Sequence, residues 1–114
     1  MKQRLLVMNG QKIVQNERDG KWTTDKVDKA GVIPPGIYNI HIAAMADKAK
    51  KHDGPILHAD DMHVFQQVGK TTVKHELKDF ARLPEIGNNI LIKYQAGLAM
   101  VAPSTLSHSR KLSR

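Results

Sequence analysis

The sequence predicts an α+β domain that is mainly β, built as a small curled antiparallel sheet or a partly open barrel with one or two short helices. Three observations predict it. Turn dipeptides recur at the short spacing typical of small sheets and barrels. Several short segments alternate apolar and polar residues, and only two segments favour helix by composition. A length of 114 residues is typical of one domain.

The first predicted element is a hairpin. Asn9-Gly10 lies between two apolar runs and favours a type I′ turn, because both central residues of that turn adopt positive φ. We therefore predict strands near residues 3–8 and 11–16. A second turn at Asp19-Gly20 leads into a strand or loop that Trp22 is expected to anchor.

A strand and a helix are predicted next. After the break at residues 34–36, Tyr38, Ile40 and Ile42 alternate with polar residues, which predicts a half-buried strand. The following segment, AAMADKAKKH at residues 43–52, predicts a short helix by propensity.

The second half predicts two further hairpins around a helix. Strands near 55–58 and 63–68 are separated by a polar turn at residues 59–61. Residues 73–83 predict a helix, capped by Thr71 or Thr72 and ended by a proline. Residues 88–102 alternate again and turn at 95–97, which predicts the last hairpin.

Charge and composition bound the function. The formal net charge of +7 suggests affinity for polyanions, DNA first among them. Direct DNA binding would be weak and steeply salt-dependent, and residues 103–114 are expected to be a flexible basic tail. The candidate phosphate-contacting residues are Lys48, Lys50, Lys51, Arg110, Lys111 and Arg114.

Cysteine is absent, which fits a reducing compartment. The first apolar run is too short for a signal-peptide core, and no stretch approaches the length of a membrane span. We therefore expect a cytoplasmic protein without a cofactor.

The densest polar segment is DDMHVFQQVGKTTVKHEL, residues 60–77. Imidazoles and carboxylates can ligate a divalent metal, so a small metal-dependent enzyme using His58, Asp61, His63 and His75 is one hypothesis. The spacing matches no established zinc pattern, and the aspartates suit an ordinary turn. Neighbouring strand residues point to opposite faces, so Asp60 and Asp61 make no acid/base pair. We assign no catalytic or metal-binding residue.

Two adjacent glutamines mark the predicted strand at 63–68. On a strand, Gln66 and Gln67 face opposite ways, so at least one faces solvent or a partner. This strand either accepts a partner strand by edge pairing or is paired within its own sheet, and the second interpretation is favoured.

The second half also carries a longer pattern: Gly-x-Ile-x-x-x-Asp, His-Val-Phe-Gln-Gln-x-Gly-Lys, a histidine ahead of a phenylalanine, Pro-x-x-Gly, Ile-x-Tyr and Gly-x-Ala-x-Val. It resembles the KfrB domain of plasmid-borne proteins, and the segments LLVMNGQKIVQNERDGKW and KVDKAGVIPPGIYNI resemble the upstream part of stand-alone members. The matching positions are Gly54, Ile56, Asp60, His63, Val64, Phe65, Gln66, Gln67, Gly69, Lys70, His75, Phe80, Pro84, Gly87, Ile92, Tyr94, Gly97, Ala99 and Val101.

The resemblance implies a single KfrB-like domain over residues 1–102 with a core motif at 54–101. It implies a non-enzymatic accessory protein of plasmid maintenance or conjugative transfer, which binds other plasmid-encoded proteins of the partition or mobilisation machinery. Packing does not obviously require four polar motif residues, so we predict that His63, Gln67, Lys70 and His75 form a recognition surface. Many relatives carry Arg where Lys70 stands, which argues against a bidentate role there. DNA binding and metal-dependent catalysis stay as alternatives.

Overall fold

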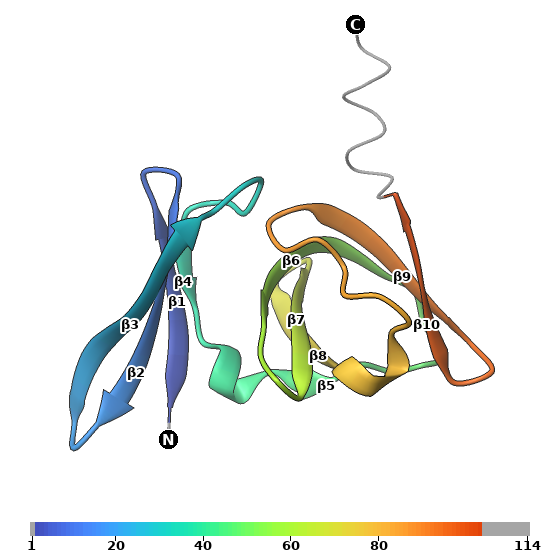
Figure 1. Cartoon of the computed structure of the whole chain (residues 1–114), viewed down its shortest axis with the longest axis horizontal. Helices are drawn as coiled ribbons and strands as arrows, with labels where there is room; N and C mark the ends of the chain where they lie inside the picture. Colours follow the sequence, from blue (N-terminus) through green and yellow to red (C-terminus); the bar gives the residue numbers. More distant parts are fainter. Residues whose placement is uncertain (1, 104–114) are drawn as a thin grey trace, which may run out of the picture.

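The computed structural model describes residues 2–103 and contains two β-sheets placed side by side (Figure 1). The first sheet has the order β3-β2-β1-β4 and the second β10-β9-β6-β7-β8-β5. The first sheet comprises β1 (Gln3–Met8), β2 (Gln11–Arg18), β3 (Lys21–Lys29) and β4 (Gly36–Tyr38). The second comprises β5 (Ala44–Met45), β6 (His52–Ala59), β7 (His63–Val68), β8 (Thr71–Glu76), β9 (Asn89–Gln95) and β10 (Leu98–Pro103).

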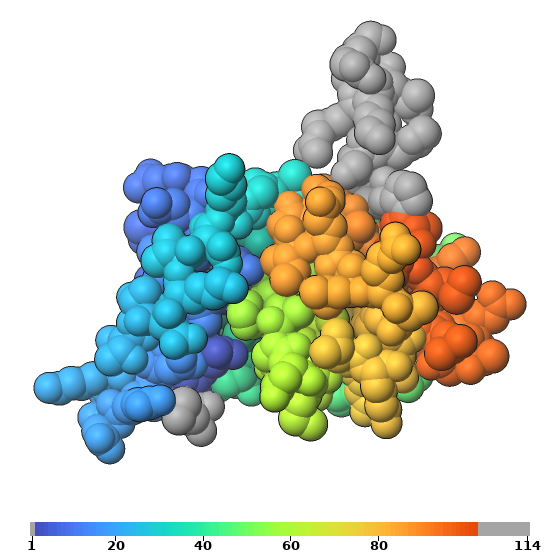
Figure 2. Space-filling model, viewed as in Figure 1, coloured from blue at the N-terminus to red at the C-terminus, as the bar shows by residue number. Residues whose placement is uncertain are grey.

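The mainly β class is confirmed. Neither sheet closes into a barrel within residues 2–103, because β10 and β5 are the two separate edges of the larger sheet. Figure 2 shows the first strands as one half of the molecule and the later strands as the other. No helix in this part of the chain is long and apolar enough to cross a membrane.

The predicted first hairpin and both predicted turns of this region are confirmed. Asn9 and Gly10 have φ of 52° and 75°, and Asp19 and Gly20 have φ of 52° and 77°. Positive φ at both central residues matches the right-handed twist of the flanking strands. Trp22 lies in β3 as expected, half-buried, with the Arg4 guanidinium 4.0 Å from its ring centroid.

The strand predicted across Tyr38, Ile40 and Ile42 is wrong. Only β4 is extended, and a 3₁₀ turn, η1 (Ile40–Ile42), follows it. A 3₁₀ turn rotates each residue by about 120°, so residues two apart no longer share a face. Ile40 therefore enters the core, whereas Ile42 is 70% exposed.

The helix predicted at residues 43–52 is also wrong. Ala44 pairs in parallel with Val73, and the Asp47 carboxylate then accepts a hydrogen bond of 2.9 Å from the Ala49 N–H. This side-chain bond stabilises a turn in place of a helix. The segment has no apolar stripe to bury, so helix propensity alone does not decide its conformation.

The helix predicted at residues 73–83 is wrong as well. Residues 71–76 form β8, which pairs with β7 from Val68↔Thr71 to His63↔Glu76, and a 3₁₀ turn, η2 (Leu77–Asp79), follows. Gly69, with φ of 62°, makes the tight turn between these strands. Cross-strand pairing therefore overrides the helical composition.

The two later hairpins are confirmed, and the longest of their strands joins both. Residues 52–55 of β6 pair with β9, and residues 56–59 pair with β7. β7 therefore lies between β6 and β8, so the hypothesis of an open edge at residues 63–68 is wrong. Pro103 belongs to β10, whereas the rest of the predicted tail lies outside the described residues.

The buried residues form two clusters. One joins the sheets and contains Leu5, Val7, Val14, Ala30, Ile33, Ile40, Ala43, Leu57 and Phe65. The other lies within the second sheet and contains Ile56, Val64, Ile92 and Ala99. Burial of such side chains is the main source of the stability of the fold.

Candidate functional site

The side chain of Gln66 lies at the point where β6 changes partner. It is fully buried, and its Nε2 donates to the carbonyl oxygens of His52, Gly54 and Ile90 at 3.2, 3.1 and 2.8 Å. An amide nitrogen has two hydrogens, so one of them is shared between two of these acceptors. Gln66 of β7 thereby ties together β6 and β9, whose own pairing begins here.

His75 continues this network. Its Nε2 lies 2.9 Å from Oε1 of Gln66, and its Nδ1 lies 2.6 Å from the Tyr94 hydroxyl. The carbonyl contacts fix the amide orientation of Gln66, so Nε2 of His75 must donate to the amide oxygen. Nδ1 is then free of a proton and accepts from the Tyr94 hydroxyl, which defines a neutral imidazole in a single tautomer.

The surroundings favour this neutral state. Burial, with a smaller contribution from His52, lowers the pKa of His75 to about 4. Burial also raises the pKa of Tyr94 to about 12, so its hydroxyl keeps its proton. The ring of His52 packs edge-on against His75, with 5.1 Å between the ring centroids.

The prediction that His75 forms part of a recognition surface is corrected by this geometry. The residue is 0% exposed and both ring nitrogens are bonded, so it cannot contact a partner from the surface. The same two bonds leave neither ring nitrogen of His75 free to ligate a metal ion. Within residues 2–103, no group of three or more His, Cys, Asp or Glu side chains is placed to hold a metal ion.

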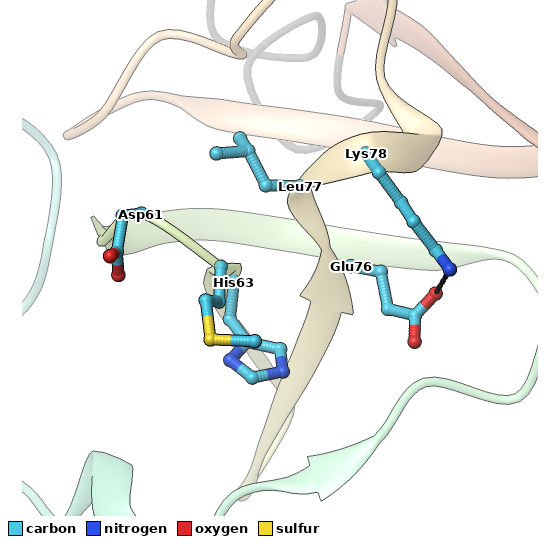
Figure 3. Close-up of a pocket in the computed structure, with 6 residues that line it drawn as sticks. Asp61, His63, Glu76, Leu77 and Lys78 are labelled. Atoms are coloured by element: carbon cyan, nitrogen blue, oxygen red, sulfur yellow. Dashed lines mark ion pairs between the residues drawn. The ribbon is translucent and has the colours of Figure 1, made fainter.

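A hollow of about 370 Å³ lies beside Asp61, Met62 and His63, at the open end of the β7–β8 hairpin (Figure 3). Asp60 shapes the preceding turn as predicted, since its carboxylate accepts from the backbone N–H groups of Met62 and His63 at 2.8 and 2.7 Å. Glu76, Leu77 and Lys78 form the other side of this hollow. The Nζ of Lys78 lies 3.6 Å from a carboxylate oxygen of Glu76, and this ion pair partly neutralises the charge of the hollow.

Gln67 and Lys70 line a second hollow of about 370 Å³, which we call the Lys70 hollow. Gln67 is held in place, because its Nε2 donates to the Gly69 carbonyl at 3.1 Å and its Oε1 accepts from the Thr72 hydroxyl at 2.6 Å. Gln66 and Gln67 therefore face opposite ways, as predicted. The residues that line the hollow are Ile37, Tyr38, Asn39, Ile42, Ala44, Gln67, Lys70, Thr71 and Thr72.

The Lys70 hollow includes Tyr38 and Ile42, which were predicted to lie on one face of a half-buried strand. Ile37 is 61% exposed and Ile42 is 70% exposed. Large exposed apolar side chains beside a polar rim are typical of binding surfaces. The 3₁₀ turn at Ile40–Ile42 exposes Ile42, which the apolar alternation of the segment did not indicate.

The predicted DNA-contacting residues are only partly described. Lys48 forms an ion pair with Asp79 at 2.9 Å and lies 5.6 Å from the ring centroid of Tyr94. Lys50 and Lys51 are exposed on the turn before β6. Arg110, Lys111 and Arg114 lie outside the described residues.

Fold and site define a small mainly β domain with a polar network buried in one sheet and hollows on its surface. Residues 51–103 match the KfrB domain. Protein TraB of Escherichia coli is 35% identical over 101 residues, which cover 86% of this chain and 69% of that protein. The chain therefore belongs to the KfrB-domain family, as the motif analysis predicted, and these matches point to a plasmid-associated function.

The buried network explains part of the family pattern physically. Gln66, His75 and Tyr94 are all positions of the motif, and the His75 side chain bonds to both of the others. These three polar side chains therefore hold β6, β7, β8 and β9 together. Gln67 bonds only to Gly69 and Thr72 within residues 2–103, and Lys70 forms no ion pair there.

Proposed function

We propose that this chain is a non-enzymatic accessory protein of plasmid maintenance or conjugative transfer that acts as a protein-interaction module. Its partners would be other plasmid-encoded proteins of the partition or mobilisation machinery. The observation that carries the proposal is the Lys70 hollow, where exposed isoleucines lie beside two polar motif residues.

The chemistry of the Lys70 hollow suggests what it binds. None of its lining residues is acidic, and Lys70 has no ion pair within residues 2–103. Ile37 and Ile42 offer apolar area, and Gln67 and Thr72 are already oriented by their mutual hydrogen bond. This combination suits a partner segment that presents apolar side chains next to a carboxylate.

The position of β4 adds support. β4 is the last strand of its sheet and, within residues 2–103, pairs only with β1, from Leu5↔Tyr38 to Val7↔Gly36. Strands with one free side accept extended segments by backbone pairing. A partner segment beside β4 would meet the isoleucines and Lys70 together.

Binding to purified partition and mobilisation proteins of the same plasmid tests the proposal. We expect capture at physiological salt, weakened about tenfold or more by Ile42→Asp or Lys70→Glu. Met62→Asp is the matched control, because Met62 is 66% exposed but lies at the other hollow. Equal weakening by all three variants, or by none, would contradict a docking role for the Lys70 hollow.

The salt dependence of binding distinguishes direct DNA binding from binding to a partner protein. A protein that holds DNA through lysines releases counterions, so its affinity falls steeply between low and physiological salt. We expect anisotropy of labelled single- and double-stranded DNA to show no binding at physiological salt. Binding that persists there, with and without residues 103–114, would make DNA the ligand in place of a protein.

A further inference from the structure

A third hollow lies between the two sheets and has a different character from the others. It measures about 430 Å³, and we call it the Lys12 cleft. Its walls come from β2, β3, the end of β6 and the loop before β9. The lining residues are Lys12, Lys26, Asp28, Lys29, His58, Ala59 and Ile86.

The charges of the Lys12 cleft do not balance. It holds three lysines against one carboxylate, Asp28, which already pairs with Lys26 at 3.3 Å. Lys29 has no ion pair within the described part of the chain. The cleft therefore carries an excess of positive charge next to the low-dielectric core, where an anion is attracted more strongly than in open solvent.

Lys12 is the most unusual member of the cleft. It is only 3% exposed, and its Nζ donates to the Leu57 carbonyl at 3.0 Å. An ammonium group has three donors, and this is its only hydrogen bond among residues 2–103. Burial lowers the pKa of Lys12, and the charge of Asp28 opposes this shift.

His58 supplies a further donor. Its ring stacks against Phe65 with 6.2 Å between centroids, and it makes no hydrogen bond within the described residues. Burial, with Lys12 nearby, lowers its pKa to about 4, so the ring is neutral at pH 7. A neutral imidazole keeps one N–H, which can donate a hydrogen bond to an oxyanion.

We propose that the Lys12 cleft binds a phosphate group, with Lys12 and Lys29 as counter-charges and His58 as a neutral donor. Lysines suit this ligand because each acts as a point charge toward the oxyanion. The phosphate can belong to a small phosphorylated molecule or to a nucleic-acid backbone. Both present the same chemistry to the cleft.

Amide NMR titrations of the full chain test this proposal. The probes are inorganic phosphate at constant ionic strength, with chloride as the control ion, and separately a short DNA duplex. We expect saturable shifts at Leu57 to Ala59 and at the facing residues of β2 and β3. Lys29→Gln should weaken binding about tenfold, the loss of one charge-assisted contact.

Three more variants sharpen the result. Asp28→Asn should tighten phosphate binding several-fold, because it removes the one carboxylate of the cleft, and this gain cannot come from damage to the fold. Lys21→Gln, at the far end of β3, should change nothing. Lys12→Met should abolish binding if its amide spectrum shows that it folds, and otherwise the Lys29 and Asp28 variants decide.

The outcomes separate cleanly. Tighter binding of the duplex than of inorganic phosphate, with the same response to the variants, identifies a nucleic-acid backbone as the source. Tighter binding of inorganic phosphate identifies a small ligand. Shifts that do not saturate, that chloride reproduces, or that ignore Lys29→Gln and Asp28→Asn would overturn the proposal.

Discussion

Replacement of Gln66 by leucine tests the structural role of the buried network. The side chains have similar volume, so the change removes hydrogen bonds without opening a large cavity. Three carbonyl oxygens lose a donor, and Nε2 of His75 loses its acceptor. At about 1 kcal/mol for each of these bonds, Gln66→Leu should lower the free energy of unfolding by about 4 kcal/mol.

The next residue provides the control. Gln67→Leu removes bonds to Gly69 and Thr72 at a half-buried position, where water replaces them, so its cost should stay below about 1 kcal/mol. Urea unfolding followed by circular dichroism measures both values, provided that the slopes agree. Equal costs for the two variants, or a cost for Gln66→Leu below about 1 kcal/mol, would refute the assignment.

Three further predictions follow from the same region. His58 and His75 stay neutral in the folded chain down to a pKa of about 4, whereas unfolded histidines protonate near pH 6.5. The contribution of these neutral histidines to the free energy of unfolding should therefore be fully present above pH 6.5 and be lost as the pH falls from 6.5 to 4. For buried His75 the loss should be roughly 3 kcal/mol. A urea midpoint that stays constant over this range would contradict the prediction. Gly54→Ala would place a Cβ against the Gln67 carbonyl oxygen, far inside van der Waals distance. Thermal unfolding should therefore show that the free energy of unfolding falls by about 1–3 kcal/mol. An unchanged midpoint would refute this close approach. Tyr94→Phe should cost about 1 kcal/mol and shift the Nδ1 resonance of the buried imidazole, and an unmoved resonance would argue against the hydroxyl contact.

Hairpins with explicit turn chemistry were predictable from the sequence. Asn9-Gly10 and Asp19-Gly20 set positive φ locally, so the strands around them followed from residues a few positions apart. Segments 43–52 and 73–83 were not. Residues 44 and 45 pair with β8, which is distant in sequence, and residues 73–76 complete a hairpin with β7 that overrides their helical composition. Local propensity carries no record of such pairing.

The candidate site was predictable to a similar degree. The family motif indicated Gln67 and Lys70, which the structure brings together on one hollow. It indicated His75 equally, yet that imidazole is buried, since a motif does not separate residues that hold the fold from residues that face a partner. Ile42 was assigned to the interior by its alternation, and only the 3₁₀ turn exposes it.

Mapping the surface of the full chain in complex with a captured plasmid-encoded partner tests the central claim most directly. Amide NMR shifts, or hydrogen-exchange protection, would be compared between the free and bound chain. We expect the changes to gather at residues 37–44 and 67–72, around the Lys70 hollow. Changes confined to the hollow beside His63, or to Lys50 and Lys51, with residues 37–44 and 67–72 unmoved, would contradict the account.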